Sequence, residues 1–307
     1  MSDVFPKNMN MKQAVLSTLA YFDLFGVPLT RSELSEHLFF AQPDEEKINI
    51  YLKESPLISA SEGYFGLNVN PSLHAEFFEK VQRARQLWKR VRRYQWLFSL
   101  CPFVELVCVC NSLPLYAVEE NSDIDLLVVT KKNRMFLART ALTLLTSLLG
   151  IRRHGNKVAG RFCLSFYVSE SRLNFKNLTL QPYDIYLAYW VKTLEPIAGN
   201  FETYENLLEL NRSWLNEYFK TIHAHRRFFR KRSKSQSTIK RWLEKILDRD
   251  ALETFTREKQ LRRAKDKSYE LKDRSGTLIR DDILKFHNDD RRAELREKWT
   301  NLLSQLL

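Results

Sequence analysis

Residues 107–130, VCVCNSLPLYAVEENSDIDLLVVT, combine two apolar runs with a polar turn and a pair of acids. The first run ends at Asn111 and Ser112, ten residues follow, and the second run begins with Asp123 and Asp125. Both runs are rich in β-branched residues, which is typical of strands that are buried on both faces. The sequence therefore predicts two core strands, the second of which starts with two carboxylates.

Asp123 and Asp125 have the alternation of a strand. Alternate residues share a face, so the two carboxylates should project together while Ile124 and Leu126 enter the core. Two neighbouring carboxylates repel each other unless a cation lies between them, and hard divalent cations prefer such oxygen ligands. The pair predicts a site for Mg²⁺ or Mn²⁺. The alternative is a solvated strand end, but two unpartnered acids in an apolar strand would be costly.

The turn after the first run completes the expected site. Its backbone N–H groups and the Ser112 hydroxyl can contact the terminal phosphates of a nucleoside triphosphate. A metal at Asp123 and Asp125 would neutralise charge on the phosphoryl group and stabilise a leaving pyrophosphate. The chemistry that this pattern favours is phosphoryl transfer.

These residues resemble the motif of the DNA polymerase beta nucleotidyltransferase superfamily, which is a Gly-Ser turn, a spacer and an Asp-x-Asp strand. The matching positions are Asn111, Ser112, Asp123 and Asp125. The likeness is closest over residues 100–130 and extends to about 180, and the chain also looks like a bacterial subgroup with an N-terminal winged helix and a helical tail. The resemblance implies that Asp123 and Asp125 are catalytic metal ligands, and that Asn111 and Ser112 bind the nucleotide.

Two positions depart from the family pattern. Asn111 stands where the family has glycine, and although asparagine tolerates the left-handed backbone better than most residues, its side chain can crowd the phosphates. On the third strand, Cys163 or Ser165 stands where the family places a third carboxylate. Four acids lie near in sequence, and none has convincing spacing: Glu119, Glu120, Glu170 and Asp184.

Residues 1–70 have the pattern of a winged-helix-like domain. A capping box at Thr30 and Glu33 opens the second of three expected helices, and the third lies at about 44–55. Residues 57–67 alternate around a glycine-containing turn, as a small hairpin does. The third helix is not notably basic, so a protein contact or a structural role is at least as well supported as DNA reading.

Three segments follow this domain. We expect a connecting basic helix at 71–100, a nucleotidyltransferase core with a small mixed sheet at 101–180, and a helical C-terminal region with a basic run at 181–307. Within the core, a helix at 134–149 should precede a third strand at 161–169. The expected fold class is α+β.

The formal net charge of +12 is concentrated at residues 226–240. Such a run favours contact with nucleic acid or another polyanion, whereas single basic clusters elsewhere usually solvate helix faces. The apolar run at 141–150 is too short for a bilayer and the N-terminus has no export signal, so we expect a cytoplasmic protein without a membrane span. The four cysteines lack a CxxC pair, which favours core thiols.

Two functions stay open at this point. The first is a metal-dependent nucleotidyltransferase that moves a nucleoside monophosphate from a triphosphate to an unidentified acceptor, with a nucleic acid and a protein among the candidates. The second is a catalytically impaired adaptor on the same fold. Arg280 and His287 also have the spacing used by HEPN ribonucleases, but such pairs are common by chance, and packing of His287 and Asp290 onto the core is the favoured reading.

Overall fold

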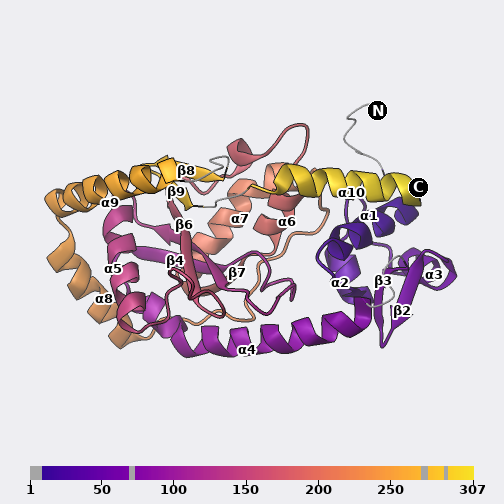
Figure 1. Ribbon diagram of the computed structural model, residues 1–307, viewed down its shortest axis with the longest axis horizontal. Helices are drawn as coiled ribbons and strands as arrows, with labels where there is room; N and C mark the ends of the chain where they lie inside the picture. The colour runs from indigo at the N-terminus through magenta and orange to yellow at the C-terminus, as the bar shows by residue number, and fades with distance from the viewer. Residues whose placement is uncertain (1–8, 69–72, 271–275, 287–289) are drawn as a thin grey trace.

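The computed structural model describes residues 9–68, 73–270, 276–286 and 290–307. Within them, ten α-helices accompany a six-stranded mixed sheet and a three-stranded antiparallel sheet (Figure 1). The α+β class expected from the sequence is confirmed. No helix in the described part of the chain is both long enough and apolar enough to cross a bilayer.

The N-terminal unit contains three helices and the small sheet. Its elements are α1 (Met11–Asp23), β1 (Leu29–Thr30), α2 (Arg31–Glu36), α3 (Glu45–Glu54), β2 (Ile58–Ser61) and β3 (Tyr64–Leu67), and the strand order is β1-β3-β2. The expected capping box is present, because the Glu33 carboxylate accepts the Thr30 backbone N–H at 2.8 Å while the Thr30 hydroxyl accepts the Glu33 N–H at 3.3 Å. The expected helices and hairpin are confirmed.

The large sheet holds the Asp-x-Asp strand near its centre. Its strands are β4 (Val104–Val109), β5 (Ile124–Thr130), β6 (Phe162–Ser169), β7 (Glu195–Gly199), β8 (Thr277–Arg280) and β9 (Ile283–Phe286), in the order β7-β4-β5-β6-β9-β8. β5 and β6 are parallel, and the other neighbouring strands are antiparallel. β5 therefore has a paired strand on each edge, and its residues 126–130 are all buried, as its apolar sequence predicts.

Helices cover the two faces of this sheet. They are α4 (Leu73–Leu100), α5 (Met135–Leu148), α6 (Ile185–Lys192), α7 (Phe201–Leu215), α8 (Lys234–Leu247) and α9 (Asp250–Glu270), with a 3-10 turn at Lys176–Leu178. The last helix, α10 (Arg292–Leu306), packs instead on α1 and α6. Because alternate strand residues face opposite ways, Leu126 and Val128 join a core with α4 and α5, whereas Leu127 and Val129 join a core with α6 and α7. Asp125 shares the second face, toward α6.

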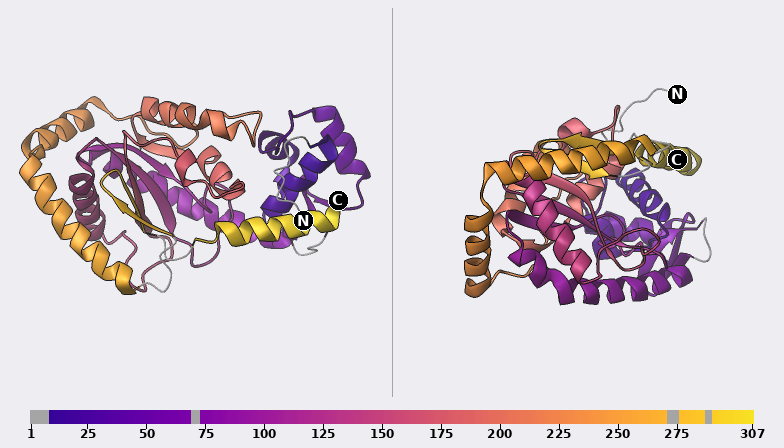
Figure 2. Two further views of the ribbon diagram at one scale, coloured as in Figure 1. Left: turned by 90° about the horizontal axis from the view of Figure 1, so that it is seen from above. Right: turned by 60° about the vertical axis from the view of Figure 1, so that its left-hand side comes forward.

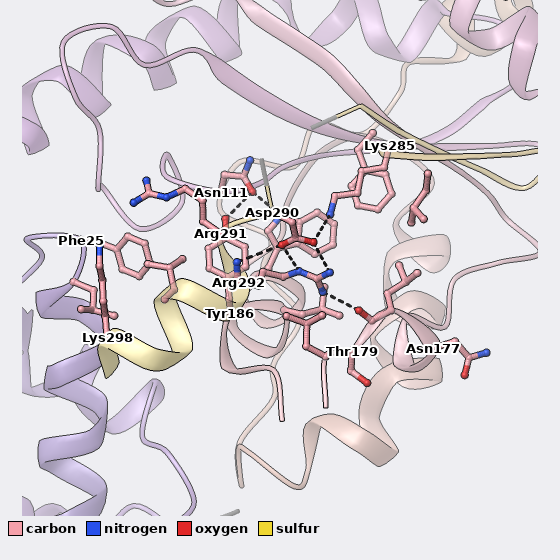
Figure 3. Close-up of a pocket in the computed structure, with 18 of the residues that line it drawn as sticks. Phe25, Asn111, Asn177, Thr179, Tyr186, Lys285, Asp290, Arg291, Arg292 and Lys298 are labelled. Atoms are coloured by element: carbon pink, nitrogen blue, oxygen red, sulfur yellow. Dashed lines mark hydrogen bonds and ion pairs between the residues drawn. The ribbon is translucent and has the colours of Figure 1, made fainter. Parts of the chain in front are cut away.

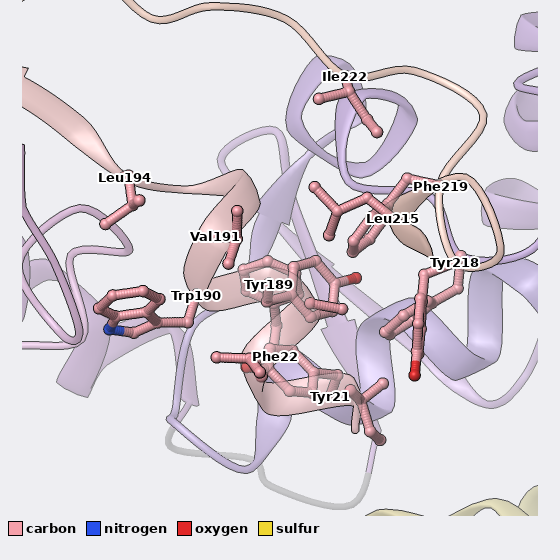
Figure 4. Close-up of a cluster of buried hydrophobic side chains, with 14 of the residues drawn as sticks. Tyr21, Phe22, Tyr189, Trp190, Val191, Leu194, Leu215, Tyr218, Phe219 and Ile222 are labelled. Atoms are coloured by element: carbon pink, nitrogen blue, oxygen red, sulfur yellow. The ribbon is translucent and has the colours of Figure 1, made fainter. Parts of the chain in front are cut away.

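Aromatic packing fixes α6 against the N-terminal unit. The Tyr189 ring stacks on Tyr21 with centroids 4.1 Å apart and meets Phe219 edge-on (Figure 4). Phe39 also meets the Tyr189 ring edge-on. At the other end of the chain, α10 lies alongside α1 (Figures 1 and 2), where the Trp299 indole donates to the Ser17 carbonyl at 2.9 Å. The small unit, α6 and α10 thus form one packed body beside the sheet.

The region from 181 to 307 is not purely helical. It supplies β7, β8 and β9, half of the large sheet, in addition to the expected helices. These strands are short, and β7 contains Pro196, so neither length nor alternation marks them in the sequence. The expectation of a helical C-terminal region is corrected by these three strands.

Candidate metal and nucleotide site

Asp123 and Asp125 lie together where β5 begins. Their carboxylate oxygens and the Cys163 sulfur all lie within 4.8 Å of one another. Cys163 arrives there because β5 and β6 are parallel and Asp125 pairs directly with it, just before a shift in register. The expected shared face of the two acids is confirmed, and Ile124 and Leu126 are buried core residues.

Asn111 links this carboxylate pair to α6. Its Nδ2 donates to Asp125 Oδ2 at 2.7 Å, and its Oδ1 accepts from the Trp190 indole at 2.8 Å and the Tyr186 hydroxyl at 3.4 Å. The backbone of Asn111 is left-handed, with φ of 61°, a conformation that asparagine tolerates better than most residues. Ser112 follows in the same turn, which closes when its carbonyl accepts the Ala117 N–H at 3.0 Å.

Arg153 provides the positive charge next to the pair. One of its Nη atoms lies 2.7 Å from Asp123 Oδ2 and 3.7 Å from the Cys163 sulfur. The Arg153 side chain is 46% exposed, whereas that of Asp123 is 13% exposed. An arriving cation can therefore displace Arg153 toward solvent without unpacking the core.

The electrostatics of the site favour added positive charge. Burial, and then the neighbouring charge of Asp123, raise the pKa of Asp125 to about 6, although the Asn111 hydrogen bond and Arg153 oppose the shift. Burial, and then Asp125, raise the pKa of the Cys163 thiol to about 12. A divalent cation between these groups would relieve the repulsion that causes part of both shifts.

The other acids considered as a third carboxylate lie elsewhere. Glu119 pairs with Lys80 at 2.7 Å, Glu170 accepts the Lys132 N–H at 3.0 Å, and Asp184 pairs with Arg292 at 2.7 Å. Glu120 is exposed in the spacer loop. In the described chain the third position beside the two aspartates belongs to Cys163.

A cavity of about 770 Å³ adjoins the site on the α6 side (Figure 3). Asn111, Tyr186 and Trp190 form part of its wall, so the residue that holds Asp125 also faces the cavity. Its other walls come from the end of α1, the segment at 177–180, strands β8 and β9, and α10. The cavity is large enough for a small-molecule ligand.

Sequence reasoning did not find Arg153, Tyr186 or Trp190. Arg153 stands 30 positions from its partner Asp123, and Trp190 stands 79 positions from Asn111. The one available signal was the four-residue spacing of Tyr186 and Trp190 on α6, which puts two aromatic residues with polar tips on one helix face. Arg280 lines the cavity, and His287 lies outside the described residues.

Comparisons with protein-family models, with curated proteins and with solved structures found no match for this chain. The case for a function therefore rests on the geometry and chemistry of the site itself.

Proposed function

We propose that this protein is a metal-dependent nucleotidyltransferase that moves a nucleoside monophosphate from a triphosphate to an acceptor. The observation that carries the proposal is the convergence of Asp123 and Asp125, with Cys163, at the start of a buried strand. The spacing of the Asn111-Ser112 turn and the order of strands and helix after it support a polymerase beta-like core, and the three helices and small sheet support a winged-helix-like N-terminal unit.

The donor set fits a divalent cation. Two carboxylates offer the hard oxygen ligands that Mg²⁺ and Mn²⁺ prefer. Burial, and then the charge of Asp123, raise the pKa of Asp125, and a cation would relieve the second of these causes. Cys163 is a softer third donor than a carboxylate, so it would be a weak ligand for such an ion. When bound, the ion would neutralise the phosphates and stabilise the leaving pyrophosphate.

The protein's own residues would position the reactants. Asp123 and Asp125 would hold the ion, while Asn111 fixes the orientation of the Asp125 carboxylate through its 2.7 Å hydrogen bond. The left-handed turn at Asn111 presents the backbone after β4 next to the two acids, where its N–H groups and the Ser112 hydroxyl can contact phosphate. Arg153 would move from Asp123 and can then pair with the same phosphates.

A second candidate is an adaptor on the same fold. Two features favour it: Cys163 occupies the third ligand position, and Arg153 forms an ion pair with Asp123. Both features lower the affinity of the site for a second metal ion. In that version the N-terminal unit and the basic run would bind nucleic acid or a protein. One residue of the run has a structural role instead, because the Lys240 ammonium is buried and donates to the Val104 carbonyl at 2.6 Å.

A diffraction experiment with Mn²⁺ and a non-hydrolysable triphosphate tests the proposal. We expect an anomalous manganese peak between Asp123 and Asp125, with the triphosphate beside Ser112. A peak at another site, or nucleotide bound without contact to either carboxylate, would support the adaptor instead.

A further inference from the structure

The cavity beside Asn111 is strongly cationic. Among the described residues that line it, Asp290 is the one acid, against six bases: Arg172, Arg280, Lys285, Arg291, Arg292 and Lys298. Figure 3 shows Lys285, Asp290 and Arg292 gathered on one side, with Phe25 on the opposite side. An excess of fixed positive charge in a concave site is suited to an anionic ligand.

Four of these bases are already matched by carboxylates. The Arg292 guanidinium lies 2.7 Å from Asp184 and 2.6 Å from Asp290, so it is held within the protein. Arg291 and Lys298 both bind Glu294, at 3.2 and 2.6 Å, and Arg172 binds Asp282 at 3.1 Å. These four residues shape the wall, and the charge available to a ligand lies elsewhere.

Lys285 and Arg280 are the less compensated cations. The Lys285 ammonium is 3.9 Å from Asp290, whose oxygens already accept from Arg292, and its side chain is only 17% exposed. Burial, and then the charge of Arg292, lower the pKa of Lys285. Arg280 has no carboxylate partner among the residues that the structure describes. An anion between Lys285 and Arg280 would supply the missing negative charge.

The cavity also has an aromatic lining. Phe25 lies just after α1, and Tyr186 and Trp190 are residues of α6. The Trp190 ring stacks on Phe166 with centroids 5.3 Å apart, which fixes its orientation. Such a surface suits a planar or apolar group, so the ligand should combine this group with an anion.

We propose that this cavity binds the acceptor of the transfer, a small molecule with an aromatic or apolar body and an oxyanion group, phosphate or carboxylate. This inference rests on the proposed function. The cavity meets the metal site at Asn111, which hydrogen-bonds both Trp190 and Asp125, so a ligand there has one end near the reacting phosphate. A hydroxyl that the acceptor carries in addition to its oxyanion group would form a bond to the α-phosphorus, its proton would pass to water, and pyrophosphate would leave with the electrons of the broken P–O bond.

Calorimetry with phenyl phosphate, benzoate and benzyl alcohol on the full chain tests the inference. We expect both anions to bind, and the neutral alcohol to bind about tenfold more weakly or not at all. Lys285→Gln should weaken phenyl phosphate binding about tenfold, whereas Lys298→Gln, whose ammonium is engaged by Glu294, should leave it within about twofold. Arg280→Gln is a second test at an exposed position where folding is not at risk, and it should also weaken binding.

The donor and acceptor roles are separated by adding nucleotide. Saturating Mg²⁺ and non-hydrolysable triphosphate should leave the affinity for phenyl phosphate unchanged. The double variant Asp123→Asn, Asp125→Asn should also bind phenyl phosphate with the affinity of the wild type. Expulsion of phenyl phosphate by the triphosphate would assign the cavity to the donor and overturn the inference, as would equal effects of Lys285→Gln and Lys298→Gln. A third outcome is that the protein binds phenyl phosphate through Lys285 but binds no triphosphate with Mg²⁺. That result would overturn both the enzyme proposal and the acceptor role, and the cavity would then be an anion-binding site alone.

Discussion

The side-chain amide of Asn111 donates a 2.7 Å hydrogen bond to the carboxylate of Asp125. The same side chain accepts from the Trp190 indole at 2.8 Å, and its backbone has φ of 61°. One residue therefore joins the candidate metal site to α6 and also makes the left-handed turn that ends β4. The identity of residue 111 should matter both for the side-chain bonds and for the backbone.

Replacing Asn111 separates these two contributions. Asn111→Gly should lower the free energy of unfolding by about 1–2 kcal/mol, because the buried Trp190 N–H loses its acceptor. Asn111→Ala should cost about 1 kcal/mol more, since alanine is strained at positive φ and glycine is not. Urea unfolding of the two variants measures the difference, and equal stability would contradict the account of the turn.

The central strands could be predicted from the sequence because their pattern is local. The run at 124–130 became β5 with the expected bounds, and the alternation of Asp123 and Asp125 put both carboxylates together. The choice of asparagine at 111 likewise agreed with a left-handed turn. In each case the deciding interaction lies within a few residues of the chain, where periodicity and backbone preference act.

The rest of the site depends on contacts between distant segments. β9 joins the sheet by pairing with β6 across more than a hundred residues, and its four residues carry no alternation of their own. Lys285 reaches the cavity only because of that pairing. The contact of Arg153 with Asp123 is of the same kind, since the arginine comes from a loop with no special pattern. Such contacts are set by topology, which a single sequence does not reveal.

The stability of the metal-free protein should depend on the ionisation of Asp125. Its folded-state pKa of about 6 lies above the unfolded value of 3.8, so the folded protein binds this proton more tightly. The free energy of unfolding should therefore fall as pH rises from about 4 to about 6. Asp125→Asn should stabilise the protein above pH 6 by on the order of 3 kcal/mol, and this gain should vanish near pH 4.

Urea unfolding in EDTA across this pH range measures the effect. Glu120→Gln, at an exposed loop position, is a charge-matched control that should change little. A gain for Asp125→Asn that is equal at pH 4 and pH 7 would show that ionisation is not the cause.

Cys163 should limit the affinity for magnesium. Cys163→Asp places a carboxylate beside Asp123 and Asp125, so Mg²⁺ affinity should rise about tenfold, the equivalent of one added charged ligand. Without metal, the same variant should be less stable than wild type because three carboxylates repel one another. Cys163→Ser, which adds no charge, should behave like wild type in both measurements. Magnesium titrations of the melting temperature give both quantities, and identical behaviour of the Asp and Ser variants would exclude Cys163 from the metal site.

Residues 230–232 of the basic run, of which Arg230 and Lys231 are exposed and Arg232 is half-buried, should contribute to polyanion binding. Arg230→Gln, Lys231→Gln and Arg232→Gln together should weaken binding of a single-stranded oligonucleotide and reduce the salt slope by on the order of 2. A triple change on α4, at Arg85, Lys89 and Arg93, removes the same charge from another surface and should have a smaller effect. Equal effects of the two triple variants would show a response to net charge alone.

The most direct measurement of the central claim is the melting temperature with Mg²⁺ and each of the four nucleoside triphosphates. A donor that binds the folded state stabilises it by mass action, by about 2.7 kcal/mol at a hundred times its dissociation constant. We predict stabilisation that needs both Mg²⁺ and triphosphate in the wild type and that disappears in Asp123→Asn with Asp125→Asn, while the variant remains folded. No shift in the wild type at millimolar triphosphate, or an equal shift in the variant, would contradict a metal-nucleotide site at Asp123 and Asp125.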